Sequence, residues 1–191
     1  MMKKYEAKTK GRFFYLIGPS GSGKDSLISY ARQRLNGNGS VVFAHRYITR
    51  PPLTSGENHI ALSKEEFMQR FTRGFFAMHW QSHACYYGIG VEINLWLMKQ
   101  CNVVVNGSRE YLPQALRLYP QIKVVLIDVS HAEIKQRLQI RGRENSDEIH
   151  TRLIHNRKFK KSFLLNVPDI VIINNDGTLK AAGEQFVQQL V

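Results

Sequence analysis

The sequence predicts an α/β fold in which helices cover both faces of a central parallel β-sheet. Short apolar segments alternate along the chain with longer segments whose apolar residues recur every three or four positions. The short segments are continuous apolar runs, which is typical of parallel strands buried on both faces. A glycine-rich turn also joins the first apolar segment directly to the first helical one. Together these observations predict a three-layer architecture with the sheet in the middle.

Each predicted strand is a short apolar run bounded by turn-forming residues. The first begins at Arg12 and ends at Ile17, immediately before Gly18. Residues 50–58 contain two prolines and a glycine, so a loop is expected there. The predicted strands are residues 12–17, 41–47, 102–106, 123–129 and 169–174.

The predicted helices follow from apolar spacing and from end signals. Ser63 with Glu66 three residues later forms a capping box at the start of one helix. Pro113 is tolerated in the first turn of another. The predicted helices are residues 24–35, 63–73, 91–100, 111–119, 133–141, 147–161 and 178–191.

Length and composition favour one globular domain spanning residues 1–191. The chain is 43% hydrophobic and 22% charged, and it contains no repeats, linker or low-complexity segment. No apolar run approaches the roughly 18 residues of a membrane span. The basic N-terminal residues lead into a strand and not into a small-residue cleavage site. Cys85 and Cys101 form no CxxC pair, which favours a reducing, cytoplasmic location.

The formal charge of +12 is compatible with more than one kind of partner. A basic surface can bind nucleic acid, but no helix-turn-helix, zinc-finger or RNP pattern accompanies it. Small polyanionic ligands are one alternative, and a general surface bias without a specific partner is another. We expect a small phosphorylated substrate, no nucleic acid and no membrane. The sequence leaves the oligomeric state open, with a homodimer as one alternative.

A glycine-rich phosphate-binding loop (P-loop) follows the first strand. Residues 18–24 read G-x-x-x-x-G-K between a strand and a helix, so their backbone N–H groups can surround phosphate oxygens. The start of the helix adds partial positive charge, and the lysine reaches the β- and γ-phosphates. The predicted ATP-binding residues of this loop are Gly18, Pro19, Ser20, Gly21, Ser22, Gly23, Lys24, Asp25 and Ser26.

Asp25 stands where this motif normally carries the serine or threonine that binds Mg²⁺. A carboxylate can bind the metal directly or through water, and we predict this role for Asp25. The alternative is a weakened metal site, because Ser26 points about 100° further around the helix.

Six segments resemble, in order, the motifs of the guanylate kinase family. This resemblance implies a P-loop kinase fold, ATP and Mg²⁺ as cofactors, an acceptor-binding region near residues 45–90 and a helical lid near residues 137–152. It also implies an ATP contact for Asn174. The matching segments are Gly18–Ser26, Ile48–Pro51 with Gly56–Glu57, Tyr86–Gly88, Arg137–Gly142, Arg152–Leu153 and Val171–Asp176.

The departures from that family lie on the acceptor side. Its second acceptor arginine corresponds to Leu53, and a phosphate-binding tyrosine corresponds to His59. The acidic residue that reads guanine falls on or beside Gln81, and a strand-end aspartate corresponds to Asn106. The resemblance therefore implies an acceptor that carries phosphate but no guanine.

A narrower resemblance shares these departures. The blocks His45–Arg50, Gly56–Ser63, Tyr86–Ile93, Val105–Arg109 and Arg141–Asn145 resemble ribose 1,5-bisphosphate phosphokinases. These enzymes use ATP to form 5-phospho-D-ribose 1-diphosphate and are associated with phosphonate utilisation. The alternatives are a nucleoside monophosphate kinase with relaxed base choice and a catalytically silent binding module.

Candidate site residues follow from the motifs and from the chemistry of phosphoryl transfer. An attacking phosphate oxygen is largely ionised at neutral pH, so positioning and cations are needed and a general base is not. Trp80, Phe75 and Phe76 are expected in the core, and His79, His83 and Cys85 lack a fourth metal ligand. Arg143 is a further candidate near the lid. The predicted catalytic residues are Lys24, Arg137, Arg141 and Arg152, and the predicted substrate-binding residues are Arg50, His59, Tyr87, Gln81, Arg46 and Arg109.

Overall fold

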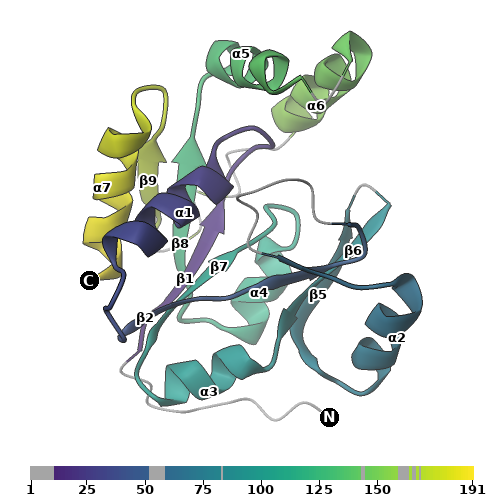
Figure 1. The fold of residues 1–191 in the computed structure, drawn as a ribbon, viewed down its shortest axis with the longest axis vertical. Coiled ribbons are helices and arrows are strands. Elements are labelled where there is room, and N and C mark those ends of the chain that lie inside the picture. Colours follow the sequence, from purple (N-terminus) through teal and green to yellow (C-terminus); the bar gives the residue numbers. More distant parts are fainter. Residues whose placement is uncertain are drawn as a thin grey trace.

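The computed structural model describes residues 11–51, 59–82, 84–142, 145–158, 164, 167 and 169–191. Its centre is a five-stranded sheet in the order β2-β7-β1-β8-β9, in which all neighbouring strands are parallel (Figure 1). The predicted central sheet is confirmed. Its strands are β1 (Phe13–Ile17), β2 (Val41–Phe43), β7 (Asn102–Asn106), β8 (Lys123–Asp128) and β9 (Val171–Asn174).

Two apolar cores lie on opposite faces of this sheet, because side chains alternate along each strand. On β1, Phe13, Tyr15 and Ile17 enter one core, while Phe14 and Leu16 enter the other. All five side chains are fully buried, as their continuous apolar run predicted. The first core includes helices α3 (Glu92–Met98) and α4 (Leu112–Leu118), and the second includes α1 (Lys24–Arg34), α5 (His131–Arg141) and α7 (Leu179–Leu190).

A second, four-stranded sheet in the order β4-β3-β6-β5 was not predicted. The single strand expected over residues 41–47 is in fact two strands that enter different sheets. Of the remaining strands, β4 has only three residues, β6 contains Gly88 and Gly90, and β5 contains polar residues in its second half, so none shows the continuous apolar run that marked the first sheet. The strands are β3 (Arg46–Ile48), β4 (His59–Ala61), β5 (Phe76–Ser82) and β6 (Cys85–Gly90).

The two faces of the second sheet have different neighbours. One face packs against α2 (Lys64–Thr72) through a small aromatic cluster that includes Phe67 and Phe76. The Ser63 half of the predicted capping box is confirmed at the start of α2, where the Ser63 hydroxyl accepts a hydrogen bond from the Glu66 N–H at 3.0 Å, while the Glu66 carboxylate accepts from Arg70 at 2.7 Å. The opposite face looks toward the phosphate-binding loop, as the contacts below show.

Helix α6 (Ser146–Lys158) follows α5, and the two helices lie together above the central sheet in Figure 1. They occupy the segment predicted as a lid. None of the helices in the described part of the chain combines the length and hydropathy that a membrane span requires.

Candidate active site

The candidate site lies where the carboxyl ends of the parallel strands meet. The loops after β1, β7, β8 and β9 all leave the same edge of the sheet. Ligands of open α/β sheets bind outside this edge, near the point where the strand order reverses. Each of these four loops carries at least one side chain discussed below.

Two glycines shape the phosphate-binding loop. Gly21 and Gly23 have φ values of 87° and 86°, in the left-handed region that favours glycine. A Cβ atom on Gly23 would lie 2.7 Å from Nδ2 of Asn175 and 3.6 Å from Nη1 of Arg137. The amide of Asn175 donates to the Ser22 carbonyl at 2.8 Å, which ties the turn after β9 to the loop.

Lys24 begins α1 with its ammonium group folded back onto the loop. Its Nζ atom donates to the carbonyl oxygens of Gly18 at 2.9 Å and Pro19 at 3.1 Å. Burial lowers the pKa of Lys24 to about 8, and the nearby cations Arg46 and Arg109 act in the same direction. The site therefore concentrates positive charge at the end of the P-loop.

Asp25 links the P-loop to the second sheet. Its Oδ1 atom accepts hydrogen bonds from Nη2 of Arg46 at 2.9 Å and from Nδ2 of Asn106 at 2.8 Å. The Arg46 side chain is 13% exposed and that of Asp25 is 41% exposed, so the pair sits at the wall of the site. Arg46 comes from β3 and Asn106 from the end of β7, so three separate elements converge here.

Asp25 also fits the predicted role of holding Mg²⁺. Mg²⁺ is usually held by one or two carboxylates together with phosphate oxygens and water. One partly exposed carboxylate beside the phosphate loop meets that requirement. Within the residues that the structure describes, no group of three or more His, Cys, Asp or Glu side chains could hold a metal by itself.

Arg137 on α5 faces the same loop from the other side. Its Nε donates to Glu133 at 2.8 Å, one turn earlier in the helix. Its Nη2 donates to the backbone carbonyl of Asn175 at 2.6 Å. These two hydrogen bonds direct the guanidinium group toward Gly23.

Asn156 on α6 is buried and hydrogen-bonds with two other parts of the site, a role that the sequence did not predict. Its Oδ1 atom accepts from Nη2 of Arg109 at 2.8 Å and from the Ser20 N–H at 3.3 Å, and its Nδ2 donates to the Ser20 carbonyl at 3.3 Å. One amide thus joins α6, the P-loop and Arg109. No sequence signal identified it, because its partners lie 136 and 47 residues away.

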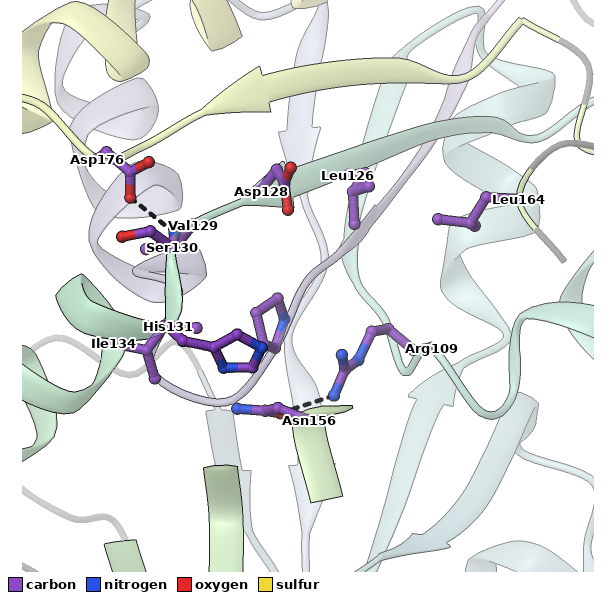
Figure 2. A pocket seen from close by; sticks show the side chains of 11 residues that line it. Arg109, Leu126, Asp128, Val129, Ser130, His131, Ile134, Asn156, Leu164 and Asp176 are labelled. Carbon is purple, nitrogen blue, oxygen red and sulfur yellow. Dashed lines mark hydrogen bonds between the residues drawn. The ribbon is translucent and has the colours of Figure 1, made fainter. Parts of the chain in front are cut away.

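A cavity of about 340 Å³ lies beside the P-loop, and Arg109 and Asn156 form part of its wall (Figure 2). Asp128, Ser130 and Asp176 are drawn on the opposite side, where Asp176 accepts a hydrogen bond from the Ser130 N–H at 2.7 Å. Arg109 therefore lines the cavity while most of its side chain is covered by protein. This burial lowers the pKa of its guanidinium group.

The structure brings many, but not all, of the predicted residues together. Tyr87 lies on the strand face that carries Arg46, and His59 is paired with Arg46 in the β3–β4 ladder. Arg50 comes two residues after the end of β3. Trp80, expected in the core, is only partly buried, although it packs against the first core.

Two predicted residues lie away from this group. Gln81 is paired with Tyr86 and is exposed on the face that packs against α2, because neighbouring strand residues point to opposite faces. Asn174 is the exposed last residue of β9 and hydrogen-bonds with Asp176, whereas its neighbour Asn175 contacts the P-loop. Ser26 is exposed on α1.

For the remaining predicted residues, the structure describes either the backbone alone or nothing. Arg141 ends α5 and Arg152 lies in α6, but their side chains are outside the described set. Leu53, Gly56, Glu57, His83 and Arg143 lie outside the described residues altogether.

Comparison with curated proteins finds relatives along the whole chain. Ribose 1,5-bisphosphate phosphokinase PhnN of Thiobacillus denitrificans is 53% identical over 182 residues, which cover 95% of this chain and 94% of the relative. The protein of the same name from Psychromonas ingrahamii is 51% identical over 190 residues, covering 100% and 94%. No family model matches the chain.

Comparison with solved structures supports the fold. Guanylate kinase from Anaplasma phagocytophilum matches with a TM-score of 0.65 and 15% sequence identity, over 96% of this chain and 86% of that one. At this identity the match bears on the fold alone, and it confirms the predicted guanylate-kinase-like P-loop architecture.

Proposed function

This chain belongs to the ribose 1,5-bisphosphate phosphokinase family, and from that premise we propose that it transfers the γ-phosphoryl group of ATP to ribose 1,5-bisphosphate, forming 5-phospho-D-ribose 1-diphosphate. The observation that carries the proposal is the 53% identity to a phosphokinase of that name over 95% of this chain. The shared name PhnN is consistent with the predicted association with phosphonate utilisation. A cytoplasmic location remains a prediction from the cysteine pattern.

The donor half of the site comprises the P-loop, Lys24 and Arg137. In this proposal the backbone N–H groups of the loop hold the β-phosphate, and Lys24 leaves its two carbonyl partners to contact phosphate oxygens. Arg137 is directed toward Gly23 and contributes a second cation. When bound, Mg²⁺ supplies further positive charge to the β- and γ-phosphates, and Asp25 is the residue that would hold it.

The acceptor half comprises residues of the second sheet, of the segment after β3 and of the loop after β7. Arg46, Arg50, His59, Tyr87 and Arg109 are the residues that we assign to the two phosphates of the sugar. An oxygen of the 1-phosphate attacks the γ-phosphorus, the bond to the β–γ bridging oxygen breaks, and ADP leaves with that electron pair. The attacking oxygen is already ionised, so these residues position it and reduce its repulsion from ATP.

The direct test is turnover by the purified protein with Mg·ATP and either ribose 1,5-bisphosphate or GMP. We expect ADP and the diphosphate product to form in equal amounts with the sugar and little ADP with GMP. Turnover mainly with GMP would identify a nucleoside monophosphate kinase instead. ATP binding without turnover of either acceptor would also contradict the proposal.

The lowered pKa of Lys24 predicts that ATP binding takes up a proton in mildly alkaline solution. In the protein without ATP, Lys24 has a pKa of about 8 and is therefore largely neutral at about pH 9. A bound phosphate would restore the positive charge of its side chain. ATP affinity should therefore fall as the pH rises through about 8. Calorimetry in buffers of different ionisation enthalpy measures the uptake, which should be absent from Lys24→Met. Equal uptake by both proteins would assign the proton to another group.

Replacement of Asp25 tests its metal role against its contact with Arg46. We expect Asp25→Asn to raise the Mg²⁺ concentration for half-maximal rate about tenfold at fixed ATP. Arg46→Ala removes the same ion pair but leaves the carboxylate, so its Mg²⁺ requirement should stay near that of the wild type. If both variants shift the requirement equally, Asp25 acts through Arg46 and not on the metal.

A further inference from the structure

Three aromatic rings from different elements pack together on the acceptor side of the site. The rings of Trp80 on β5 and Tyr87 on β6 are parallel, with centroids 5.5 Å apart and an interplanar angle of 2°. The ring of Tyr111, which precedes α4, lies 5.4 Å from Trp80 at 31°. We call Trp80, Tyr87 and Tyr111 the aromatic wall.

Strand register places the wall on the sheet face that meets the phosphate loop. Ile48 is paired with Tyr87, and Tyr87 is paired with Trp80, so all three side chains share one face. Arg46 is two residues before Ile48 and therefore points the same way. Because Arg46 contacts Asp25, this is the face that closes the acceptor side of the site.

The wall also reaches the loop that carries Arg109. Tyr111 is buried, its ring contacts Trp80 of β5, and its backbone N–H donates to the Ser108 hydroxyl at 3.4 Å. Tyr111 is thus fixed to both β5 and the loop after β7. Trp80 and Tyr87, by contrast, are only partly buried. The wall therefore combines a buried base with partly exposed ring surface on the sheet face that carries Arg46.

We propose that Trp80 determines acceptor specificity by filling the space that a nucleobase would need beside the acceptor phosphate. The indole presents a flat apolar surface against which a sugar ring can pack, and it excludes a larger base by steric overlap. The neighbouring Gln81 points to the opposite face of the sheet, so its amide does not lie on the face where the Trp80 indole lies. This inference rests on the proposed function, since it explains how a base-free acceptor is selected.

Alanine replacement of Trp80 tests the inference, and Trp96 supplies a matched control. Trp96 on α3 is also partly buried and packs against the same core. For Trp80→Ala we expect kcat/KM for ribose 1,5-bisphosphate to fall and that for GMP or AMP to rise, which changes their ratio about a hundredfold. Trp80→Phe should change the ratio less. For Trp96→Ala we expect any loss to affect all acceptors equally, so the ratio should stay unchanged.

A second measurement does not depend on turnover or on folding of the alanine variant. In Trp96→Phe, Trp80 is the one remaining tryptophan of the chain, and ribose 1,5-bisphosphate should change its fluorescence. An unchanged acceptor ratio in a folded Trp80→Ala protein, together with no fluorescence response, would overturn the inference while leaving the proposed function intact. Failure of the wild type to phosphorylate ribose 1,5-bisphosphate would instead overturn the proposed function.

Discussion

Replacing Lys24 with methionine is expected to lower kcat about a thousandfold while the protein remains folded. In the proposed mechanism the Lys24 ammonium group contacts the transferring phosphate, and methionine keeps most of the side-chain length without the charge. The loss should appear in kcat at saturating ATP and acceptor, because the charge on the γ-phosphate oxygens changes most in the transition state.

The expected effect on stability is much smaller. The carbonyl oxygens of Gly18 and Pro19 lose a hydrogen-bond donor, which costs about 1–3 kcal/mol. Removing a charge that burial disfavours offsets part of this cost, as the lowered pKa of Lys24 indicates. Domains of this size are typically stable by about 5–15 kcal/mol, so the variant should fold.

Lys123→Met is the matched control for Lys24→Met. Lys123 begins β8, at the edge of the sheet opposite the phosphate loop, and its ammonium group lies 5.9 Å from the centre of the Phe14 ring. We expect its kcat to stay within about twofold of the wild type. A Lys24→Met protein with normal melting behaviour and kcat within tenfold of the wild type would show that Lys24 does not act on the transferred group.

Local patterns predicted the phosphate loop and the central sheet well. The strand, the glycines and Lys24 are adjacent in sequence, so one short motif specifies the geometry between β1 and α1. Buried parallel strands leave continuous apolar runs, and each of the five predicted runs contains a strand of the central sheet, although the run over residues 41–47 also continues into β3 of the second sheet. The fold class could therefore be read from segments of a few residues.

The second sheet could not be predicted in the same way. It pairs β3 with β6 and β4, and its register depends on contacts between distant segments. The chain also passes from one sheet to the other at Ala44 and His45, where no glycine or proline marks the break. Asn156 escaped prediction for a similar reason, since a lone asparagine in a helix acquires its partners only through tertiary structure.

Gln81 and Trp80 show how a shift of one residue matters in a strand. The resemblance to guanylate kinases puts the acceptor-reading position on or beside Gln81, which leaves an uncertainty of one residue. Adjacent residues of a strand point to opposite faces. A shift of one residue therefore moves the predicted side chain from the face toward the site to the face that packs against α2. Trp80 is paired with Tyr87 and therefore lies on the face that carries Arg46, while Gln81 is paired with Tyr86 on the α2 face, which is why we propose Trp80 for this role.

Arg137→Ala should lower kcat about a hundredfold, which is the second-largest effect we expect. Its guanidinium group lies beside Gly23 of the P-loop and is held there by Glu133 and the Asn175 carbonyl. Arg137→Lys keeps the charge but loses the planar fork, so it should recover only part of the activity. Activity should be measured as kcat and KM for ATP at saturating acceptor.

Arg70→Ala separates this catalytic role from the loss of a helical ion pair. Arg70 pairs with Glu66 one turn earlier on α2, at 2.7 Å, as Arg137 pairs with Glu133 at 2.8 Å on α5. Such pairs one helical turn apart contribute about 0.3–0.5 kcal/mol, and Arg137 additionally loses a charged hydrogen bond of about 2 kcal/mol. We therefore expect both variants to melt cooperatively, with Arg137→Ala less stable and only Arg137→Ala deficient in kcat. Equal activity of the two variants would mean that Arg137 holds the turn after β9 in place and does not stabilise the transferring phosphate.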